Sequence, residues 1–252
     1  MEFINVTEEN IDNEHICCVM SDKKGENCIK TKKDWMREQF KNGLVFKKLN
    51  ERGKIFIEYM PCENAWYPFE ADGWMVIHCL WVAGKYKGQG IAAALLDECI
   101  KDSREKGRKG IVALSAKKKK TFLSDGDFLK YKGFKTADTS FADFELLYLP
   151  FDEEADIPKI RQCAKTGTIS DKTLTLYYTN QCPYTEKYVN LIKKIADDRN
   201  VKMNIKRFNS REEAQNAPCP FTTYSLFYNG SFVTNEIFSE KKFIKFLDEN
   251  NL

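Results

Sequence analysis

Apolar and polar positions along the first 150 residues follow two periods, one typical of strands and one typical of helices. Apolar or alternating runs predict strands at residues 2–6, 44–48, 55–60, 111–114 and 144–151. A helical period covers residues 32–40. The stretch from Trp74 to Ile100 combines an apolar strand, a basic turn with glycines and an amphipathic helix, which ends at Lys106–Gly107. These residues therefore predict a mixed α/β domain.

A second pattern starts after residue 172. Residues 151–172 are first acidic and then small and polar, which is typical of a connector. Beyond them the periods predict, in order, a strand, a helix, a strand, a short helix, a hairpin and a last helix. Ser210 with Glu213 forms a capping-box pattern, and Asn229–Gly230 is a strong signal for a type I′ turn. We therefore expect a domain at 1–150, a linker at 151–172 and a second domain at 173–252.

The basic turn that follows the strand at Trp74 has the chemistry of a phosphate-binding loop. Gly88 and Gly90 have no Cβ, so a bulky anion can approach their backbone N–H groups. The first N–H groups of the next helix lack intrahelical partners and lie at the positive end of the helix dipole. Lys85 and Lys87 add positive charge at the same place. The turn is therefore suited to a pyrophosphate group.

The spacing of this turn distinguishes between families of phosphate loops. The Gly-Lys-Ser/Thr of a P-loop is absent, and Ala93 stands where a dinucleotide-binding turn has its third glycine. Lys87-x-x-Gly90-x-Ala92 instead resembles the Gln/Arg-x-x-Gly-x-Gly/Ala signature of the GNAT superfamily of acyl-CoA N-acyltransferases, with Lys in the first position. Residues 121–134, TFLSDGDFLKYKGF, resemble the last helix of that family and its closing Gly-Phe. The alternative is an ordinary strand-to-helix turn that contains glycines.

The resemblance implies an α/β (α+β) fold in which the fourth and fifth strands diverge and acetyl-CoA lies between them. Backbone groups of the fourth strand would pair with the pantetheine amides of the cosubstrate, at Leu80, Trp81 and Val82. The turn would hold the pyrophosphate, at Lys87, Gly88, Gln89, Gly90, Ile91 and Ala92. The implied reaction transfers acetyl directly to an amine, which requires a base for the ammonium group and an acid for the leaving thiolate.

The catalytic groups are less evident. His78 lies on the strand where many GNAT relatives place a base, and imidazole suits that role near neutrality; the alternative is a hydrogen-bonded core histidine. Glu70 and Asp72 could instead act through water. The position of the tyrosine that serves as the acid in relatives is occupied by Leu129. The candidate Tyr131 is two residues further on, roughly 200° around a helix, so it would point elsewhere and water is the alternative donor.

The sequence does not identify the acceptor, which we expect to be a small-molecule amine. Aromatic candidates for its site, which could equally belong to the core, are Trp66, Tyr67, Phe69 and Trp74. Asp125 and Asp127 could attract a cationic amine or could cap a helix. Lys117–Lys120 is either a solvated loop tip or a contact for the phosphates of CoA.

The element order in 173–252 resembles thioredoxin-like βαβαββα domains, and the YoaP-type domain that follows some GNAT domains. Cys182-Pro183-Tyr184 resembles the glutaredoxin active site, but Thr185 stands where those enzymes have their second cysteine. Cys182 would lie at a helix N-terminus, which favours the thiolate. In that fold a cis-proline loop faces this turn, and Cys219–Pro220 occupies its place. Cys182 and Cys219 could therefore form a reversible disulfide; the alternative is two small buried thiols.

Together the resemblances predict an N-acetyltransferase whose C-terminal domain helps to bind the acceptor or a partner. One alternative is a thiol-based redox or binding protein that uses Cys182, with or without Cys219, and whose N-terminal domain only binds acyl-CoA. Another is a non-catalytic interaction module. Since GNAT relatives often pair, a homodimer is a further expectation.

Composition limits the remaining classes. The 252 residues are 42% apolar, and the formal charge of +3 is small and similar in both halves, which argues against a nucleic-acid partner. Without an apolar run of membrane-spanning length or a signal segment, and with nine scattered cysteines, we expect a cytoplasmic protein. His15-Ile16-Cys17-Cys18 is a conceivable metal corner, but it has no second cluster, so we expect no metal.

Overall fold

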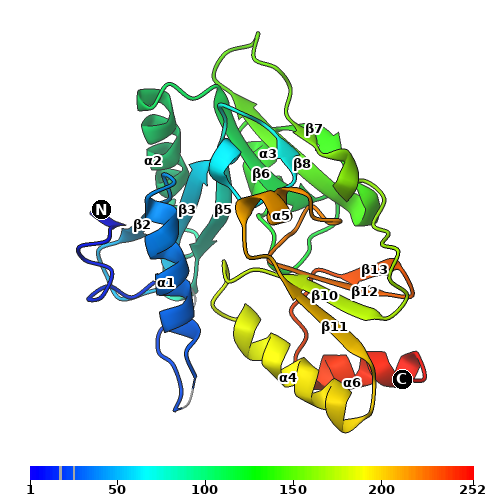
Figure 1. Ribbon diagram of the computed structural model, residues 1–252. Helices are drawn as coiled ribbons and strands as arrows, with labels where there is room; N and C mark the ends of the chain where they lie inside the picture. The colour runs from blue at the N-terminus through cyan, green and yellow to red at the C-terminus, as the bar shows by residue number, and fades with distance from the viewer. Residues whose placement is uncertain (17–18, 25) are drawn as a thin grey trace.

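The computed structural model describes residues 1–16, 19–24 and 26–252, and two β-sheets divide the chain into two parts (Figure 1). The first part contains a seven-stranded sheet in the order β1-β2-β3-β5-β6-β8-β7. Its elements are β1 (Phe3–Val6), α1 (Cys28–Phe40), β2 (Val45–Leu49), β3 (Ile55–Pro61), β4 (Phe69–Glu70), β5 (Met75–Val82), α2 (Ile91–Glu105), β6 (Gly110–Ala116), α3 (Gly126–Tyr131), β7 (Lys135–Thr139) and β8 (Phe144–Pro150).

The seven-stranded sheet is antiparallel except between β5 and β6, which run parallel. Alternate side chains of a strand point to opposite faces of a sheet. Ile77 of β5 packs with Leu95 of α2 and Leu129 of α3. Its neighbour Val76 belongs to a separate core that includes Trp35 of α1 and the second part of the chain. Helices α2 and α3 thus cover one face, and α1 with the second part covers the other.

The second part contains a four-stranded sheet in the order β11-β10-β12-β13, with β10 and β11 parallel and the other pairs antiparallel. Helices α4 and α6 lie together beside this sheet (Figure 1). The hairpin turns at Asn229 and Gly230, whose φ angles of 49° and 80° are the positive pair that a type I′ turn requires. The helices and strands of the second part are β10 (Leu174–Tyr178), α4 (Thr185–Asp198), β11 (Met203–Arg207), α5 (Arg211–Gln215), β12 (Tyr224–Tyr228), β13 (Ser231–Thr234) and α6 (Glu240–Glu249).

The order of elements in the second part is the one that the sequence predicts. At the short helix α5, Ser210 Oγ accepts a hydrogen bond from the Glu213 N–H at 3.1 Å, as in a capping box. The likeness of this part to thioredoxins stays a prediction.

The segment between β3 and β4 is held by the second part of the chain. Gln215 Nε2 donates hydrogen bonds to the carbonyl oxygens of Glu63 at 3.2 Å and Ala65 at 2.9 Å. Thr222 Oγ1 donates to the carbonyl oxygen of Trp66 at 2.6 Å. These bonds fix main-chain groups that would otherwise need water, so the two parts form one folded body with a common core.

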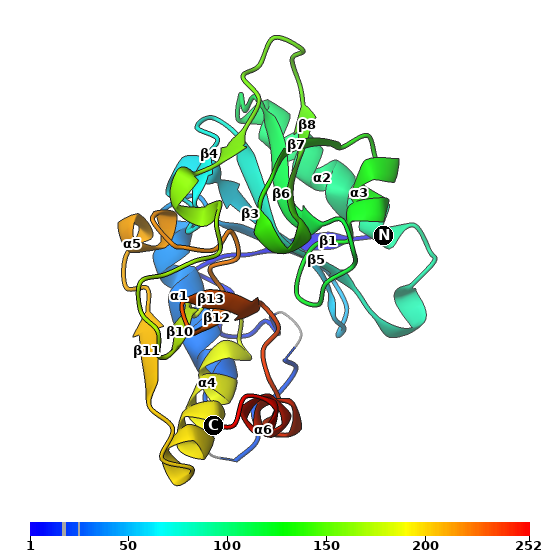
Figure 2. The same ribbon diagram turned by 90° about the vertical axis from the view of Figure 1, so that its right-hand side faces the viewer.

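Helix α1 of the first part lies beside α4 of the second (Figure 2). Thr31 Oγ1 donates a hydrogen bond to Glu186 Oε2 at 2.7 Å. Lys187 Nζ forms an ion pair with Glu26 Oε1, also at 2.7 Å. Both contacts lie near the N-terminus of α4, so the turn that precedes α4 is brought close to α1.

The segment predicted as a linker, 151–172, is partly built into the fold. Residues Lys159–Ile160 form β9, which pairs antiparallel with β4. Ile160 and Ala164 are buried. The domain boundaries themselves stay a prediction, although the first sheet ends at Pro150 and the second begins at Leu174.

Several details differ from the expectations. The sequence signals missed β7, and α1 begins at Cys28 rather than at residue 32. Helix α3 is shorter than 121–134 because Asp125 caps its N-terminus at residue 126. No cis peptide bond occurs among the described residues, so the bond between Cys219 and Pro220 is trans, in contrast to the expected cis-proline loop. None of the helices in the described ranges has the length and apolar character needed to cross a lipid bilayer.

Candidate active site

Strands β5 and β6 pair along only part of their length. Their register joins Met75 to Ile111, Val76 to Val112 and Ile77 to Ala113. Beyond Ile77, β5 continues to Val82 and β6 to Ala116, yet the described residues show no further pair between these strands. The two strands therefore diverge in the middle of the sheet, as the sequence resemblance implies.

The divergence starts at a β-bulge. Glu58 of β3 pairs with Cys79 and Tyr59 pairs with Ile77, so His78 is an extra residue on β5. A bulge bends its strand and increases the local twist, which accounts for the separation of β5 from β6. The imidazole of His78 is only 1% exposed although the residue as a whole is half-buried, so its exposed part is the main chain.

The residues expected to pair with pantetheine lie on the diverging end of β5. Leu80, Trp81 and Val82 pair with β3 on one side of the strand. Along an antiparallel pair, alternate main-chain groups point away from the partner strand. Some N–H and C=O groups of this segment therefore face the side where β6 has moved away. Trp81 is 48% exposed there.

The turn after β5 presents backbone to open space. Gly88 and Gly90 both have φ of 76°, a left-handed conformation that glycine adopts without strain. Apart from the glycine itself and its chain neighbours, no heavy atom of the described residues lies within 4 Å of where a Cβ would stand at either position. Gln89 Nε2 donates to the carbonyl oxygen of Lys85 at 2.7 Å, which fixes the turn from within.

Helix α2 begins directly after this turn. Gly90 is its N-cap residue, and no side chain of the described residues caps the helix there. The first amide with a partner inside the helix is that of Ala94, which donates to the Gly90 carbonyl oxygen at 3.0 Å. Ile91 is buried against the core and anchors the helix, while its N–H belongs to the first turn. The N-terminus of α2 therefore has the geometry expected of an anion site, with first-turn N–H groups that no side chain caps and the exposed Lys87 beside them.

Under the β5 bulge lies a buried chain of charged groups. Lys32 Nζ of α1 is 2.6 Å from Glu58 Oε2, and the two side chains are 1% and 3% exposed. Glu58 Oε1 is 3.1 Å from Nδ1 of His78. Burial alone would raise the pKa of Glu58, but the Lys32 ammonium and His78 together hold it below its ordinary value. Burial lowers the pKa of His78, although its hydrogen bond to Glu58 acts in the opposite direction.

The lowered pKa values of Glu58 and His78 define which ring nitrogen of His78 carries the proton. Glu58 is ionised, so it can only accept hydrogen bonds, and Nδ1 of His78 must donate to it. The neutral ring then has a lone pair on Nε2. That atom is buried and has no hydrogen-bond partner among the described residues. His78 is thus both a buried, hydrogen-bonded histidine and a potential base.

The aromatic candidates divide into core residues and one neighbour of His78. Phe69 and Trp74 are buried, and Trp66 is half-buried. The ring centroid of Tyr67 lies 5.4 Å from that of His78.

The sequence signals did not identify Glu58, the partner of His78, or Lys32, the partner of Glu58. These two residues come from other elements than His78 and carry no local motif.

The candidate proton donors and acidic groups do not belong to the buried group of Lys32, Glu58 and His78. Tyr131 is 85% exposed, as its offset predicts, whereas Leu129 is buried; Tyr131 as the acid stays a prediction, with water as the alternative donor. Asp125 caps α3, its Oδ1 accepting from the Phe128 N–H at 3.1 Å. Glu70 and Asp72 are exposed and precede β5, at the opposite end from the glycine turn.

The two cysteines proposed for a disulfide are not joined. Cys219 is a free thiol that is fully buried, and burial raises its pKa to about 12. Cys182 lies in the turn before α4, where its carbonyl oxygen accepts from the Thr185 N–H at 3.1 Å. Because Cys219 remains protonated near neutrality, it lacks the thiolate that exchange chemistry requires.

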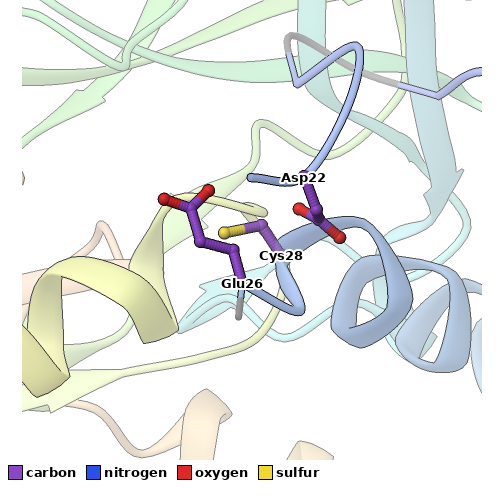
Figure 3. Close-up of side chains that lie close together, drawn as sticks. All are labelled: Asp22, Glu26 and Cys28. Carbon is purple, nitrogen blue, oxygen red and sulfur yellow. The ribbon is translucent and has the colours of Figure 1, made fainter. Parts of the chain in front are cut away.

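Potential metal ligands occur together once in the described ranges, at Asp22, Glu26 and Cys28 (Figure 3). Both carboxylates already have protein partners. Asp22 accepts from the N–H of Ile29 at 3.1 and 3.2 Å, and Glu26 binds Lys187. Of the metal corner considered from the sequence, Cys17 and Cys18 lie outside the described residues; His15 Nε2 lies 2.8 Å from the Gly53 carbonyl oxygen.

Comparisons with known proteins agree with both sequence resemblances. Residues 14–120 match the model of the acetyltransferase (GNAT) family, and residues 203–245 match the YoaP-like family. Over 248 residues the chain is 41% identical to the uncharacterized N-acetyltransferase YoaP of Bacillus subtilis (strain 168), covering 98% of this chain and 99% of that protein.

The solved structures to which the chain is similar include one complex with acetyl-CoA and one with coenzyme A. A GNAT family acetyltransferase from Brucella melitensis in complex with acetyl-CoA is 17% identical, with a TM-score of 0.39, over 62% of this chain and 90% of that one. The PaiA N-acetyltransferase from Thermoplasma acidophilum in complex with coenzyme A is 17% identical, with a TM-score of 0.40, over 60% of this chain and 100% of that one.

Proposed function

This chain belongs to the GNAT acetyltransferase family, and on that premise we propose that it transfers acetyl from acetyl-CoA directly to the amine of a small molecule. The observation that carries the proposal is the open end of the β5–β6 pairing, which lies next to the uncapped N-terminus of α2. A strand edge for the pantetheine amides and an anion site for the pyrophosphate thus follow each other along one stretch of chain.

The proposed cosubstrate site uses main chain more than side chains. Backbone groups of Leu80 to Val82 would pair with the pantetheine arm as an added strand would. The N–H groups from Gly88 to Ala92 would bind the pyrophosphate, with Lys87 adding charge. Gly88 and Gly90 fit this role because a Cβ at either would stand in the open space that the anion needs.

In the proposed mechanism His78 is the base. Nε2 of its neutral ring takes the proton from the attacking ammonium, and the Glu58 carboxylate holds the ring in this tautomer and stabilises the imidazolium that forms. The amine nitrogen then attacks the thioester carbonyl carbon, and the carbon–sulfur bond breaks. The nitrogen loses its second proton as the amide forms, and this proton passes through water to the leaving thiolate, because the family's tyrosine position holds the buried Leu129.

We further propose that residues 173–252 help to bind the acceptor. The turn before α4 supports this role, because Gln181 Nε2 donates to the Tyr67 hydroxyl at 2.8 Å and Tyr67 contacts His78. A reversible disulfide between Cys182 and Cys219 has no comparable support, since Cys219 is buried and protonated.

Isothermal titration with acetyl-CoA tests the cosubstrate site. Gly90→Asp places a negative charge beside the proposed pyrophosphate, and two unit charges a few ångströms apart at such a site interact by about 1–3 kcal/mol, roughly 5- to 150-fold in Kd. Gly90→Asn is the matched control, because it has the same shape and tolerates a positive φ but carries no charge. We expect a Kd for Gly90→Asp well above that of Gly90→Asn. Equal affinity of Gly90→Asp and the wild type would contradict the assignment.

A further inference from the structure

Several buried polar atoms without hydrogen-bond partners gather where the two parts of the chain meet. Buried polar groups in native proteins are nearly all hydrogen-bonded, so each exception needs a physical reason. Of the eight side-chain atoms of this kind among the described residues, five belong to α1, to β5, to the turn that leads into α4 or to the first residue of α4. These five are Trp35 Nε1, His78 Nε2, Asn180 Oδ1, Gln181 Oε1 and Thr185 Oγ1.

Direct contacts connect this group across the boundary. The ring of His78 lies 6.1 Å from that of Trp35 and 5.4 Å from that of Tyr67, measured between centroids. The Tyr67 hydroxyl accepts a hydrogen bond from Gln181 Nε2. Gln181 is 7% exposed, so its amide is held in place while its carbonyl oxygen is left without a partner. The second part of the chain thereby brings an unused acceptor to the tyrosine that packs against the proposed base.

The unpartnered atoms have a consistent chemistry. His78 Nε2, Asn180 Oδ1 and Gln181 Oε1 are acceptors, whereas Trp35 Nε1 can only donate. A primary amine offers several N–H donors to such acceptors. The indole N–H, in turn, requires an acceptor on the ligand, such as a carboxylate or amide oxygen. A molecule with both groups would satisfy atoms that the protein leaves unpaired.

We propose, on the basis of the acetyltransferase function above, that the acceptor is a small primary amine that also bears a carboxylate or amide oxygen, and that it binds between His78 and the turn at Asn180–Thr185. Gln181 is then a substrate-binding residue supplied by the C-terminal part. Because these atoms are shielded from solvent, the acceptor enters when the turn moves away from β5. The C-terminal part thus determines which amine is acetylated.

The test measures CoA release with a panel of primary amines that carry a neighbouring carboxylate or amide oxygen, each paired with an alkylamine that lacks the oxygen. The wild type is expected to show lower KM values for the first kind. Gln181→Met keeps the side-chain volume but removes both the acceptor and the donor to the Tyr67 hydroxyl, and it should raise the KM of the best amine about ten- to hundredfold while leaving the Kd for acetyl-CoA unchanged.

Gln215→Met is the matched control, because Gln215 also bridges the two parts but binds the main-chain carbonyls of Glu63 and Ala65 rather than a side chain that contacts His78. It should leave the KM for the amine unchanged. An unchanged KM for the amine in Gln181→Met, or equal increases of this KM in both variants, would overturn the inference about the acceptor but not the proposed function. A wild type that binds acetyl-CoA but acetylates no amine of the panel would overturn the proposed function, and the inference with it.

Discussion

The buried ion pair between Lys32 and Glu58 provides a quantitative test of the site. Both side chains are almost fully buried and their charged atoms are 2.6 Å apart. Glu58→Gln removes the negative charge and leaves the Lys32 ammonium in the core without a counter-charge. Breaking a buried pair in this way costs about 3–5 kcal/mol. Since a domain is stable by only about 5–15 kcal/mol, the loss should be large.

A second ion pair of the same types serves as the control. Lys47 of β2 and Glu98 of α2 are also 2.6 Å apart, but their side chains are 14% and 39% exposed. Solvent screens such a pair, so Glu98→Gln should cost about 0–1 kcal/mol. The two variants make the same chemical change at the same distance, so the difference between them measures burial together with the loss of the carboxylate to which His78 donates.

Urea unfolding measures both variants, provided that the slope of free energy against urea stays constant. The double variant Lys32→Met, Glu58→Gln removes both charges, and we expect it to be more stable than Glu58→Gln alone, because no charge is left unpaired. The reasoning is refuted if Glu58→Gln loses no more stability than Glu98→Gln, or if the double variant loses the sum of its two single changes.

Two further predictions concern pH and the proton donor. In the folded protein the pKa values of His78 and Glu58 lie below their ordinary 6.5 and 4.5, so the unfolded chain binds more protons and stability should fall as pH drops below about 6.5. The thermal midpoint of His78→Gln should therefore fall less between pH 7 and pH 5 than that of the wild type. An identical fall in both proteins would count against a buried neutral imidazole. Tyr131→Phe should change stability by less than about 0.5 kcal/mol and leave the rate of CoA release unchanged, because the ring is 85% exposed. A tenfold slower release of CoA would instead support Tyr131 as the acid.

The conformation of the glycine turn could be predicted from the sequence because its signal is local. Gly88, Gly90 and the apolar stretches on either side are contiguous, and both glycines have the positive φ that their spacing suggests. Strand β7 could not be predicted from the sequence, because it has no local signal. Its sequence, KTADT, carries no apolar alternation, and it becomes a strand through pairing with β8. Tertiary context overrides a weak local preference there.

The role of His78 could not be decided from the sequence because its environment is assembled from distant segments. Glu58 is 20 residues away and belongs to the neighbouring strand, while Lys32 approaches from α1. The bulge that exposes the main chain of His78 depends on the register between β3 and β5, which no local pattern encodes. The two interpretations of His78, core residue and base, prove compatible, since burial and the bond to Glu58 are what leave Nε2 unprotonated.

The contacts between the two parts also determine how the C-terminal part has to be tested. The segment that leads from β3 towards β5 is fixed by Gln215 and Thr222, and the core is continuous across the boundary. Deleting residues 173–252 would expose that core and release the segment before β5, so lost activity would say nothing about acceptor binding. Single substitutions avoid this problem. Gln181→Met and Gln215→Met disturb the same boundary, and a difference between them in the KM for the amine can arise only near the base.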